Sequence, residues 1–552
     1  MITYTQDSAP LRLHSLLGKD ALIPISVRGD EGINRLFAYT IEAVAPDGKS
    51  VAIDKLLGTD ALLEIRLPTG PARYIHGDIH AVSHTVSRGP LRRFNVDIRP
   101  SLARLARVRR SRVFHNLDLL EIFRQVTKGV CSITFELHRP IASAVNLVTQ
   151  YRETDLEFFM RLCGETGLAW FWRHTEKGHE LVLTSRTSLA STGGTIAFDP
   201  TEGITESRPR IWSWSVTGKQ VARHAEILDT HFQWFGLPLQ AEGRTDGTIK
   251  AGSTEYRLGT FTAPSQEDAL GQARLIDSVG INRENVPQGM DQVQDRLESA
   301  AKWAAQGMAS EAVTAIAEGN CPHLQPGQSV NIASLPEWEG DWIVTGMAHD
   351  IRISDGNLTS NQTTLECRVG LRLAPIALEQ FPWPPLPKPN VGGVLTAVVT
   401  GPEGLETFVD PFGRVKVQYL WDREARGLGD DSFWIRVSQN WAGKGYGTFF
   451  WPRIGNEVVV AFENGDPDRP IVVGSVYNSH TGTPLALPGM ALVQGLRTRL
   501  QGSQAGEKAH SLLFSDDPSE PIVHLKSNTM FLVHQRREQQ NSSTDTQFNI
   551  RG

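Results

Sequence analysis

Apolar and polar residues alternate regularly over residues 410–478. The alternation falls into short runs, most of which place a valine, isoleucine or aromatic residue at every second position. A period of two is typical of strands that bury one face. We therefore predict strands over Arg414–Trp421, Phe433–Ser438, Glu457–Phe462 and Pro470–Tyr477, with a fifth, Val394–Thr400, just upstream.

Residues that favour turns separate these runs. Gly, Asn, Asp and Pro gather between them, and the segment Asp466-Pro467-Asp468-Arg469 has aspartate at its first position and proline at its second. Type I turns prefer these residues at these positions. Five short strands with turns this close together fit a small closed β-barrel such as the OB fold.

Alternating runs also dominate residues 1–115, which predicts a first β-barrel. Turn residues at Asp47-Gly48 and Gly89-Pro90 separate some of these runs. Residues 180–260 return to the same pattern, and two later runs are predicted to close a second barrel. The runs are RLFAYTIEAV, ALLEIRL, RYIHGDIHAVSHTVS and LRRFNVDIR in the first barrel, and LQPGQSVNIA and WEGDWIVTGMAHDI in the second.

Helical spacing of apolar residues interrupts the strands. Asn116 is expected to cap one helix, and Thr154 with Glu157 forms the pattern of a capping box at the start of another, which Gly167 would end. The run LAWFWRH then resumes as a strand. A longer helical region is predicted over residues 264–315, with Pro264-Ser265 opening its first helix.

A proline-rich stretch divides the chain. Phe381–Asn390 holds five prolines in ten residues; this composition excludes it from a sheet ladder and favours a stiff, extended linker. We therefore predict a hub of two lobes over 1–380, the linker over 381–390, the OB domain over 391–482, and a connector with short strands over 483–552. The short strands are expected at SLLFSD, PIVHLK and TMFLVHQ.

Several stretches resemble a known family, the VgrG proteins, which are the trimeric spike-hubs of bacterial type VI secretion systems. The OB domain of that family resembles the segments GRVKVQYLWDRE, FWIRVSQNWAGKGYG and WPRIGNEVVVAFENGDPDRPIVVGSVYN. Its hub half, which is similar to a contractile-phage tail hub, resembles LFAYTIE, HGDIHAVSH and RFNVDIRPSLARL in that order. The motif residues that carry the OB resemblance are Gly413, Arg414, Val415, Trp421, Asp422, Trp434, Arg436, Trp441, Gly443, Pro452, Arg453, Gly455, Glu457, Gly465, Asp466, Pro467, Asp468, Pro470, Gly474 and Asn478.

The resemblance implies a mainly β fold with helical insertions: two hub β-barrel lobes, an OB-fold barrel and the start of a trimeric β-prism needle. One needle chain alone would expose strand edges, which threefold winding removes. The implied role is a non-enzymatic homotrimer that caps a tube of Hcp hexamers, contacts baseplate proteins, and carries a PAAR-type tip and effectors or adaptors through target membranes. From the residues themselves we expect no cofactor, no metal and no nucleic-acid partner. The helical stretch 290–315 departs from the family pattern.

Composition narrows the class of protein. A net charge of −6 over 552 residues argues against a general nucleic-acid binder. The first residues lack the basic-then-apolar pattern of a secretory leader, so we expect synthesis in the cytoplasm and export by a dedicated machine. The cysteines lie far apart without a C-x-x-C motif, which predicts reduced thiols at Cys131, Cys163, Cys321 and Cys367.

Three histidines in one run are the first candidate for chemistry. His76, His80 and His84 would share a helix face suited to a metal. The surrounding alternation predicts a strand instead, with all three on a solvated polar face. His179-Glu180 begins like the zinc motif H-E-x-x-H but lacks the second histidine, so we predict no metal site there.

Nucleophile and phosphate motifs are absent from the sequence, which contains neither G-x-S-x-G nor a P-loop. The helix carboxylates Glu121, Asp155 and Glu157 have capping or surface roles available, and none has a partner for general acid catalysis. A basic stretch is predicted to be a solvated face, or to pair with a neighbouring subunit, because few aromatic residues interleave with it. It comprises Arg92, Arg93, Arg99, Arg104, Arg107, Arg109, Arg110 and Arg112.

Two other classes of function stay open. One is an enzyme, either a hydrolase hidden in the hub or the core of a longer, effector-bearing VgrG protein. The other is an OB-type module that binds a glycan or nucleic acid. Acidic loop residues would repel phosphates, so we expect the tryptophans of the barrel to pack it and a trimer seam. The tryptophans are Trp421, Trp434, Trp441 and Trp451, and the acidic residues are Asp422, Glu424, Asp430, Asp431, Glu463, Asp466 and Asp468.

Overall fold

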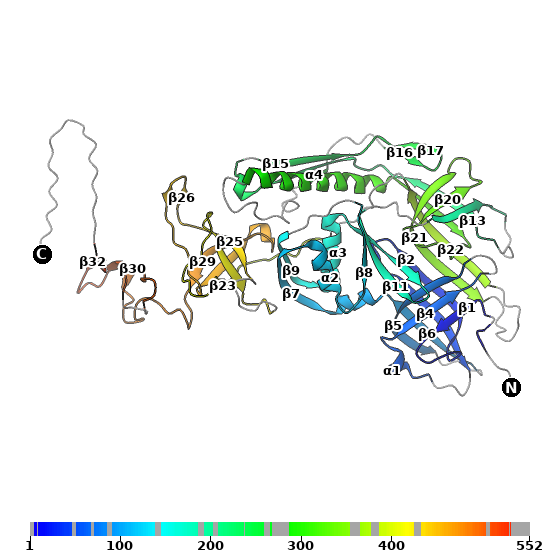
Figure 1. Cartoon of the computed structure of the whole chain (residues 1–552), viewed down its shortest axis with the longest axis horizontal. Coiled ribbons are helices and arrows are strands. Elements are labelled where there is room, and N and C mark those ends of the chain that lie inside the picture. The colour runs from blue at the N-terminus through cyan, green and yellow to red at the C-terminus, as the bar shows by residue number, and fades with distance from the viewer. Residues whose placement is uncertain are drawn as a thin grey trace.

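The structure is a computed structural model of the whole chain (Figure 1). It describes residues 5–7, 9–46, 51–67, 71–85, 91–138, 145–185, 192–201, 208–236, 238–258, 265–267, 286–353, 365–376, 386–423, 432–503, 508–528 and 530. The turns predicted at Asp47-Gly48 and Gly89-Pro90 lie outside these ranges, as do Glu424, Asp430, Asp431 and most of TMFLVHQ.

The first lobe is a curved antiparallel sheet with strand order β1-β4-β5-β6-β3-β2. Its inward faces carry the alternating apolar residues that the sequence indicated, with Ile41, Ile75 and Val96 fully buried. Its elements are β1 (Leu11–His14), β2 (Ile23–Gly32), β3 (Ala38–Pro46), α1 (Ile53–Leu56), β4 (Asp60–Ile65), β5 (Arg73–Thr85), β6 (Leu91–Arg99) and the 3-10 helix η1 (Ser101–Arg107).

The second lobe shares a strand with the first. The long strand β21 (Gly340–Ile353) pairs with β2 of the first lobe through its C-terminal half and with β20 through its N-terminal half. Pairing of β21 with β22 closes a ring of strands, β21-β20-β12-β13-β19-β22, around a second core. The remaining bounds are β12 (Thr192–Phe198), β13 (Arg210–Gly218), β19 (Val313–Gly319), β20 (Ser329–Ala333) and β22 (Leu365–Pro375).

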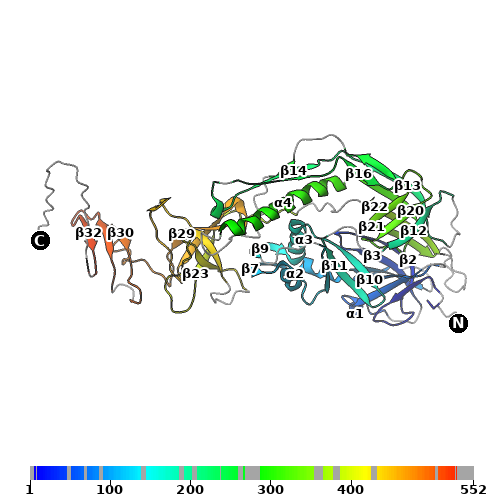
Figure 2. The same cartoon turned by 45° about the horizontal axis from the view of Figure 1, so that its top comes forward.

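A layer of helices and short sheets lies between the first lobe and the OB barrel (Figures 1 and 2). The capping box is confirmed: Glu157 N–H donates to Thr154 Oγ1 at 3.1 Å, and Thr154 N–H donates to Glu157 Oε2 at 2.7 Å. Gly167 ends that helix at a φ of 62°, which glycine adopts without strain. The elements are β7 (Arg109–Leu117), α2 (Leu119–Thr127), β8 (Ile133–Glu136), β9 (Val145–Thr154), α3 (Asp155–Thr166), β10 (Ala169–Thr175) and β11 (Gly178–Thr184).

One predicted cap is wrong. Asp118, not Asn116, caps α2, and its side chain accepts the N–H of Leu120 at 2.7 Å. Asn116 lies in β7 with a φ of 50°. Strand β7 continues through Leu117, so the helix cap lies two positions later than predicted. It falls on Asp118, the next residue with a short acceptor side chain.

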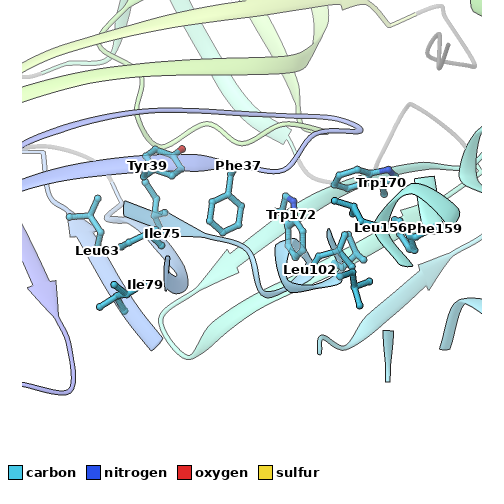
Figure 3. Close-up of a cluster of buried hydrophobic side chains, with 14 of the residues drawn as sticks. Phe37, Tyr39, Leu63, Ile75, Ile79, Leu102, Leu156, Phe159, Trp170 and Trp172 are labelled. Atoms are coloured by element: carbon cyan, nitrogen blue, oxygen red, sulfur yellow. The ribbon is translucent and has the colours of Figure 1, made fainter. Parts of the chain in front are cut away.

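The cores of the first lobe and the helical layer are continuous. Figure 3 shows Phe37 beside Trp172, and their ring centroids lie 5.5 Å apart with the rings edge to face. Trp170 N–H donates to the side chain of Asn34 at 2.8 Å, which ties β10 to the turn after β2. The hairpin β10–β11 is therefore held against the first lobe by both apolar and polar contacts.

An arm runs from the second lobe towards the OB barrel (Figure 1). It consists of α4 (Val286–Ser310) over a small sheet, in which Gly243 of β15 lies so close to the helix that a Cβ there would be 1.9 Å from the carbonyl oxygen of Ala301. The sheet is β14 (His224–Asp229), β15 (Leu239–Arg244) and β18 (Ser265–Glu267), and the hairpin β16 (Thr248–Ala251)–β17 (Thr254–Arg257) follows β15 along the chain.

The predicted helical region 264–315 is only partly correct. Ser265–Glu267 is a strand that pairs in parallel with β14, and α4 ends at Ser310, after which β19 begins at Val313. Pro264 and residues 268–285 lie outside the described ranges. The sequence of Ser265–Glu267 has no strand periodicity of its own, and its form depends on pairing with a distant strand.

The five strands predicted for the OB domain are confirmed as a closed barrel, β23-β24-β25-β29-β28. Val415, Val417 and Tyr419 point into its core as predicted. The strands are β23 (Leu395–Thr400), β24 (Val415–Tyr419), β25 (Phe433–Val437), β28 (Glu457–Phe462) and β29 (Pro470–Val476); the hairpin β26 (Ala442–Gly443)–β27 (Tyr446–Gly447) and the 3-10 helix η5 (Glu463–Gly465) join them.

The C-terminal strands form an antiparallel sheet, β30 (Val493–Arg497), β31 (Ser511–Ser515) and β32 (Ile522–Lys526), at the far end of the elongated molecule (Figure 1). Two of the three strands match SLLFSD and PIVHLK. Within the described ranges, α4 and the shorter helices are not long and apolar enough to cross a membrane.

Candidate functional site: the joint between hub and OB barrel

One turn of the OB barrel, Asp466–Arg469, makes ionic and hydrogen-bond contacts with the hub. The predicted type I turn is present, with Arg469 N–H donating to Asp466 O at 2.9 Å. Asp466 also accepts the N–H of Asp468 at 2.9 Å, which fixes the turn from inside. Gly465 precedes it at a φ of 74°, where a Cβ would lie 2.4 Å from the side chain of Asn390 in the linker.

Asp468 binds the hub. Its carboxylate accepts the N–H of Thr149 in β9 at 2.7 Å, and the Thr149 hydroxyl donates to Pro467 O at 3.3 Å. Lys388 of the proline-rich linker donates to the same carboxylate at 2.9 Å. Burial opposes ionisation of Asp468, but Lys388 and Arg161 outweigh it and hold the pKa of this carboxyl below its usual value. Strand β9 of the hub and the proline-rich linker therefore both bind the carboxylate of Asp468, although they lie far from this turn in the sequence.

A buried ion network in α3 and β9 supports this contact from below. The side chain of Arg161 is 1% exposed and donates to both oxygens of Glu153 at 2.8 and 2.9 Å, and to Glu165 at 2.9 Å. It also donates to the carbonyl oxygen of Thr149 at 3.0 Å. The guanidinium therefore orders the residue whose N–H binds Asp468, and its buried charges are balanced within the network.

Arg469, the next residue of the turn, binds the arm instead. Its guanidinium pairs with Asp229 at the end of β14, whose side chain is 1% exposed. Phe232, in the 3-10 helix η2 (Phe232–Trp234) at the arm tip, lies under the guanidinium groups of Arg414 and Arg436, at 5.4 and 5.2 Å from its ring centroid. Neighbouring residues of one turn therefore attach the barrel to two separate parts of the hub.

A cavity of about 520 Å³ lies beside the arm tip, between the arm and the barrel. Its walls combine aromatic side chains with arginines, and the arginines already pair with carboxylates: Arg414 with Asp410, Arg436 with Glu463 and Arg469 with Asp229. The cavity is therefore electrostatically balanced.

Several other motif residues have structural roles in the barrel. Gly413 adopts a φ of 73° against the indole of Trp451. Arg453 pairs with Glu406 at 2.9 Å, and Asn478 donates to Glu457 at 2.7 Å. The sequence placed these residues in one domain; the structure adds that they order its loops, whereas Asp466–Arg469 faces the hub.

Two of the predicted acidic loop residues are buried. Asp466 and Asp468 do not form a repulsive surface, because both are folded into the joint with Lys388. The tryptophans divide into two groups. Trp421 stacks on Tyr419 at 4.8 Å and Trp434 packs on Phe408 at 4.9 Å, whereas Trp441 and Trp451 are exposed.

The histidine prediction is partly wrong. The run does form strand β5, but a register shift next to His80 breaks the alternation. His80 is exposed beside Arg107, whereas His76 is half-buried under the hairpin β10–β11, and its Nδ1 lies 3.0 Å from Nδ1 of His179. Within the described ranges, the acidic, histidine and cysteine side chains form no cluster that could hold a metal ion.

The basic stretch pairs mainly within its own chain. Arg104 contacts Asp78 at 2.7 Å and Arg93 contacts Glu42 at 2.7 Å. Arg110 and Arg112 both contact Asp155, at 3.1 and 3.3 Å. These contacts neutralise much of the positive charge that the sequence concentrates here.

Sequence reasoning missed the hub side of the joint. Thr149, Arg161 and Asp229 lie hundreds of residues from the turn that they hold, and no local pattern marks them. Lys388 carried a weak signal, since it is a lysine enclosed by prolines in the linker.

Large apolar side chains are exposed on the OB barrel and on the C-terminal strands beyond it. The hairpin β26–β27 and its flanks expose Trp441 (62%), Tyr446 (61%) and Phe449 (68%). The C-terminal sheet buries little: four of the five residues of β30 and all five of β32 are exposed. Other exposed apolar residues lie in or next to β29, in the connector and in the C-terminal sheet: Val473, Val476, Tyr477, Leu487, Met490, Leu492, Leu496, Phe514, Ile522, Val523 and Leu525.

Comparisons with known proteins agree on both parts of the chain. The family model of the phage tail baseplate hub (GPD) matches residues 30–355, which include α4, and the type VI secretion system/phage-baseplate injector OB domain matches residues 407–477. The type VI secretion system spike protein VgrG1a of Pseudomonas aeruginosa is 30% identical over 90% of this chain and 73% of its own length. VgrG1c of the same organism is 30% identical over 92% and 66%, respectively.

Other relatives are longer. The actin cross-linking toxin VgrG1 of Vibrio cholerae is 28% identical over 90% of this chain but only 43% of its own length. Among solved structures, the E. coli c3393 protein, a type VI secretion component similar to the T4 tail proteins gp27 and gp5, matches with a TM-score of 0.56 at 17% identity, over 84% of this chain and all of its own. A Francisella PdpA-VgrG complex matches with a TM-score of 0.55 at 8% identity, over 94% of this chain and 88% of its own.

Proposed function

Because the chain belongs to the VgrG family of type VI secretion spike proteins, we propose that three copies assemble into the hub and spike base of such a machine. Two hub lobes in each of three chains provide six similar units, which suits stacking on the hexameric Hcp tube. The OB barrels narrow this ring towards the needle. Baseplate proteins surround the hub, and a PAAR-type tip with effectors or adaptors attaches at the far end.

One observation carries the trimer: the apolar surface of the barrel and the C-terminal sheet has no cover within the described part of one chain. Large exposed apolar patches mark contact sites, and among the described residues the outer strands β30 and β32 each leave one edge unpaired. Winding of three chains around one axis covers both. The exposed Trp441 and Trp451 are then placed at the seam between barrels.

The joint supports a mechanical function. A spike that is pushed along its axis must transmit force from hub to needle without bending. Two attachments on neighbouring residues, Asp468 to β9 and Arg469 to the arm, resist rotation of the barrel in a way that one attachment would not. In this proposal the joint connects the hub (1–380) and the linker (381–390) to the OB domain (391–482), and the needle start (483–552) follows.

We propose that this chain itself is not an enzyme and binds no nucleic acid. Most named relatives are spike proteins, while one is named a toxin. The net charge of −6 and the internal pairing of the basic stretch oppose phosphate binding. In this proposal the secretion machine exports the folded trimer.

The mass of the purified full chain tests the assembly. Light scattering across a dilution series should give the mass of three chains, and the trimer should retain Hcp in a pull-down. A single-chain mass that persists at high concentration, with the C-terminal strands protected from hydrogen exchange, would contradict the proposal. Micromolar binding of an oligonucleotide or glycan to the trimer would favour the OB-module alternative.

A further inference from the structure

Four polar groups meet where the hairpin β10–β11 rests on the first lobe. His174 and His179 come from the hairpin, His76 from β5 and Ser101 from η1. The ring of Phe37 lies edge-on to both hairpin histidines, with centroids at 4.8 and 5.8 Å, so the imidazoles sit beside the apolar core seen in Figure 3. None of these groups belongs to the joint described above.

The contacts fix where each ring proton lies. Nε2 of His179 accepts the backbone N–H of Ser101 at 3.2 Å and lies 3.1 Å from the Ser101 hydroxyl oxygen. Its proton is therefore on Nδ1, which lies 3.0 Å from Nδ1 of His76. Nδ1 of His174 accepts the backbone N–H of His76 at 3.1 Å, so its proton is on Nε2. Both hairpin rings therefore hold the first lobe as neutral acceptors of backbone N–H groups.

The same cluster reaches the second lobe. Nε2 of His174 lies 3.7 Å from Glu31 of β2, whose carboxylate binds Arg73 at 2.7 and 2.8 Å. Nε2 of His349 in β21 lies 3.4 Å from the other oxygen of Glu31. The carboxylate is thus already neutralised by a guanidinium and is a poor counter-ion for a second cation.

We propose that His174 and His179 form a pH-sensitive clasp: as neutral rings they help bind the hairpin to the hub, and in mild acid their protonation loosens this attachment. A second proton on Nε2 of His179 would face the N–H of Ser101, and one on Nδ1 of His174 would face the N–H of His76. Each added proton places a donor opposite a backbone donor, so the contact with that backbone N–H is lost, although the Ser101 hydroxyl oxygen can still accept from the His179 ring.

The charges around the rings favour the neutral form. Burial, then His76 and Arg104, lower the pKa of His179 to about 4, against a smaller opposing effect of Asp60. Burial and Arg73, with His179 and His76, lower the pKa of His174 well below its usual value, although Glu31 opposes them. A folded-state pKa below the unfolded value of 6.5 means that the unfolded chain takes up protons first. The clasp is therefore intact above pH 6.5 and weakens as the pH falls from 6.5 towards 4.

Hydrogen exchange of the full-length protein tests the clasp, because the Ser101 and His76 amides are its donors. After correction for intrinsic exchange rates, we expect their protection to fall roughly tenfold between pH 6.5 and pH 5, as uptake of one proton by the opened form requires. The Ala315 amide, within the core of the second lobe, should change much less. Equal protection of Ser101 at both pH values would overturn the proposal.

A substitution separates His179 from other titrating groups. In His179→Gln the amide oxygen can still accept the Ser101 N–H but cannot be protonated, so the acid-dependent fall at Ser101 should disappear. The matched control is His84→Gln, because His84 is an exposed residue of β5 whose ring stacks on Phe94, away from the cluster. This variant should keep the wild-type fall in protection at Ser101. An unchanged fall in His179→Gln would refute the clasp, and if that variant does not fold, the wild-type comparison of Ser101 with Ala315 decides. Trimer mass, measured in the same samples, reports separately on the proposed assembly.

Discussion

Replacement of Asp468 by asparagine should loosen the joint between hub and barrel. Asparagine keeps the shape and retains an oxygen for the Thr149 N–H, but it places an NH2 group where the carboxylate received Lys388 at 2.9 Å. Breaking a buried ion pair by removing one partner costs about 3–5 kcal/mol. The lower end applies here, because Lys388 is partly exposed and retains Asp466 at 3.7 Å and Glu165 at 3.9 Å.

The expected loss of about 3 kcal/mol corresponds to an increase of roughly 100-fold in the opening equilibrium of the joint. The Thr149 amide reports it directly, since its hydrogen-bond acceptor is the Asp468 side chain. We therefore expect exchange at Thr149 to accelerate by about that factor in Asp468→Asn, while the barrel core stays protected.

Asp517→Asn is the matched control, because Asp517 is a carboxylate whose partners are Ser519 and the turn before β32, far from the joint. It should leave exchange at Thr149 unchanged. Thr149 exchange at the wild-type rate in Asp468→Asn would refute the view that this carboxylate carries the joint. A double replacement with Lys388→Met should recover part of the loss, because it removes the unpaired charge.

Three further predictions follow from other parts of the molecule. Arg469→Met leaves Asp229 buried without its partner, so amides of the arm tip around Trp234 should exchange faster by a factor equivalent to about 3 kcal/mol, while Thr149 does not; equal effects at both places would show a single attachment. Val523→Glu places a charge on the apolar surface of β32 and should give single chains in sedimentation, whereas Lys526→Glu on the same strand should remain trimeric; a trimeric Val523→Glu would exclude this surface from the assembly. Thr154→Ala removes the capping box of α3 and should lower hub stability by about 1 kcal/mol in chemical denaturation, with no change in trimer mass; a loss below a few tenths would show that packing alone fixes the helix start.

The stability that Asp468 contributes also has a defined pH dependence. Its folded-state pKa lies below the unfolded value of 3.8. The contribution is therefore complete above about pH 5 and is lost as the pH falls through the folded-state pKa. Protection of the Thr149 amide from exchange should therefore fall at a lower pH than protection of the Ser101 amide. Loss of protection at the same pH for both amides would argue against two separate titrating sites.

The sequence predicted best where local pattern and final structure agree. Each OB strand buries one face in the core of the barrel, so alternation such as that of Val415 and Val417 was sufficient to place it. The capping box at Thr154 and Glu157 was equally local. These elements need no distant partner to be recognised.

Prediction failed where a distant partner decides the outcome. Ser265–Glu267 is a strand because β14 lies beside it, and His76 is half-buried because the hairpin β10–β11 packs on its face of β5. The joint is the extreme case: the turn Asp466–Arg469 was predicted correctly, but its function lies in Thr149 and Asp229, which only the fold brings to it.

Strand β21 has a consequence for how the hub can come apart. One uninterrupted strand pairs with β22 along one edge, and with β20 and β2 on successive halves of the other edge. Unfolding of either lobe therefore removes hydrogen bonds between strands from the other lobe. A fragment that ends before Gly340 would leave both lobes without β21. Hub lobes expressed separately should aggregate rather than fold on their own. Thermal unfolding of the intact hub should be a single cooperative transition.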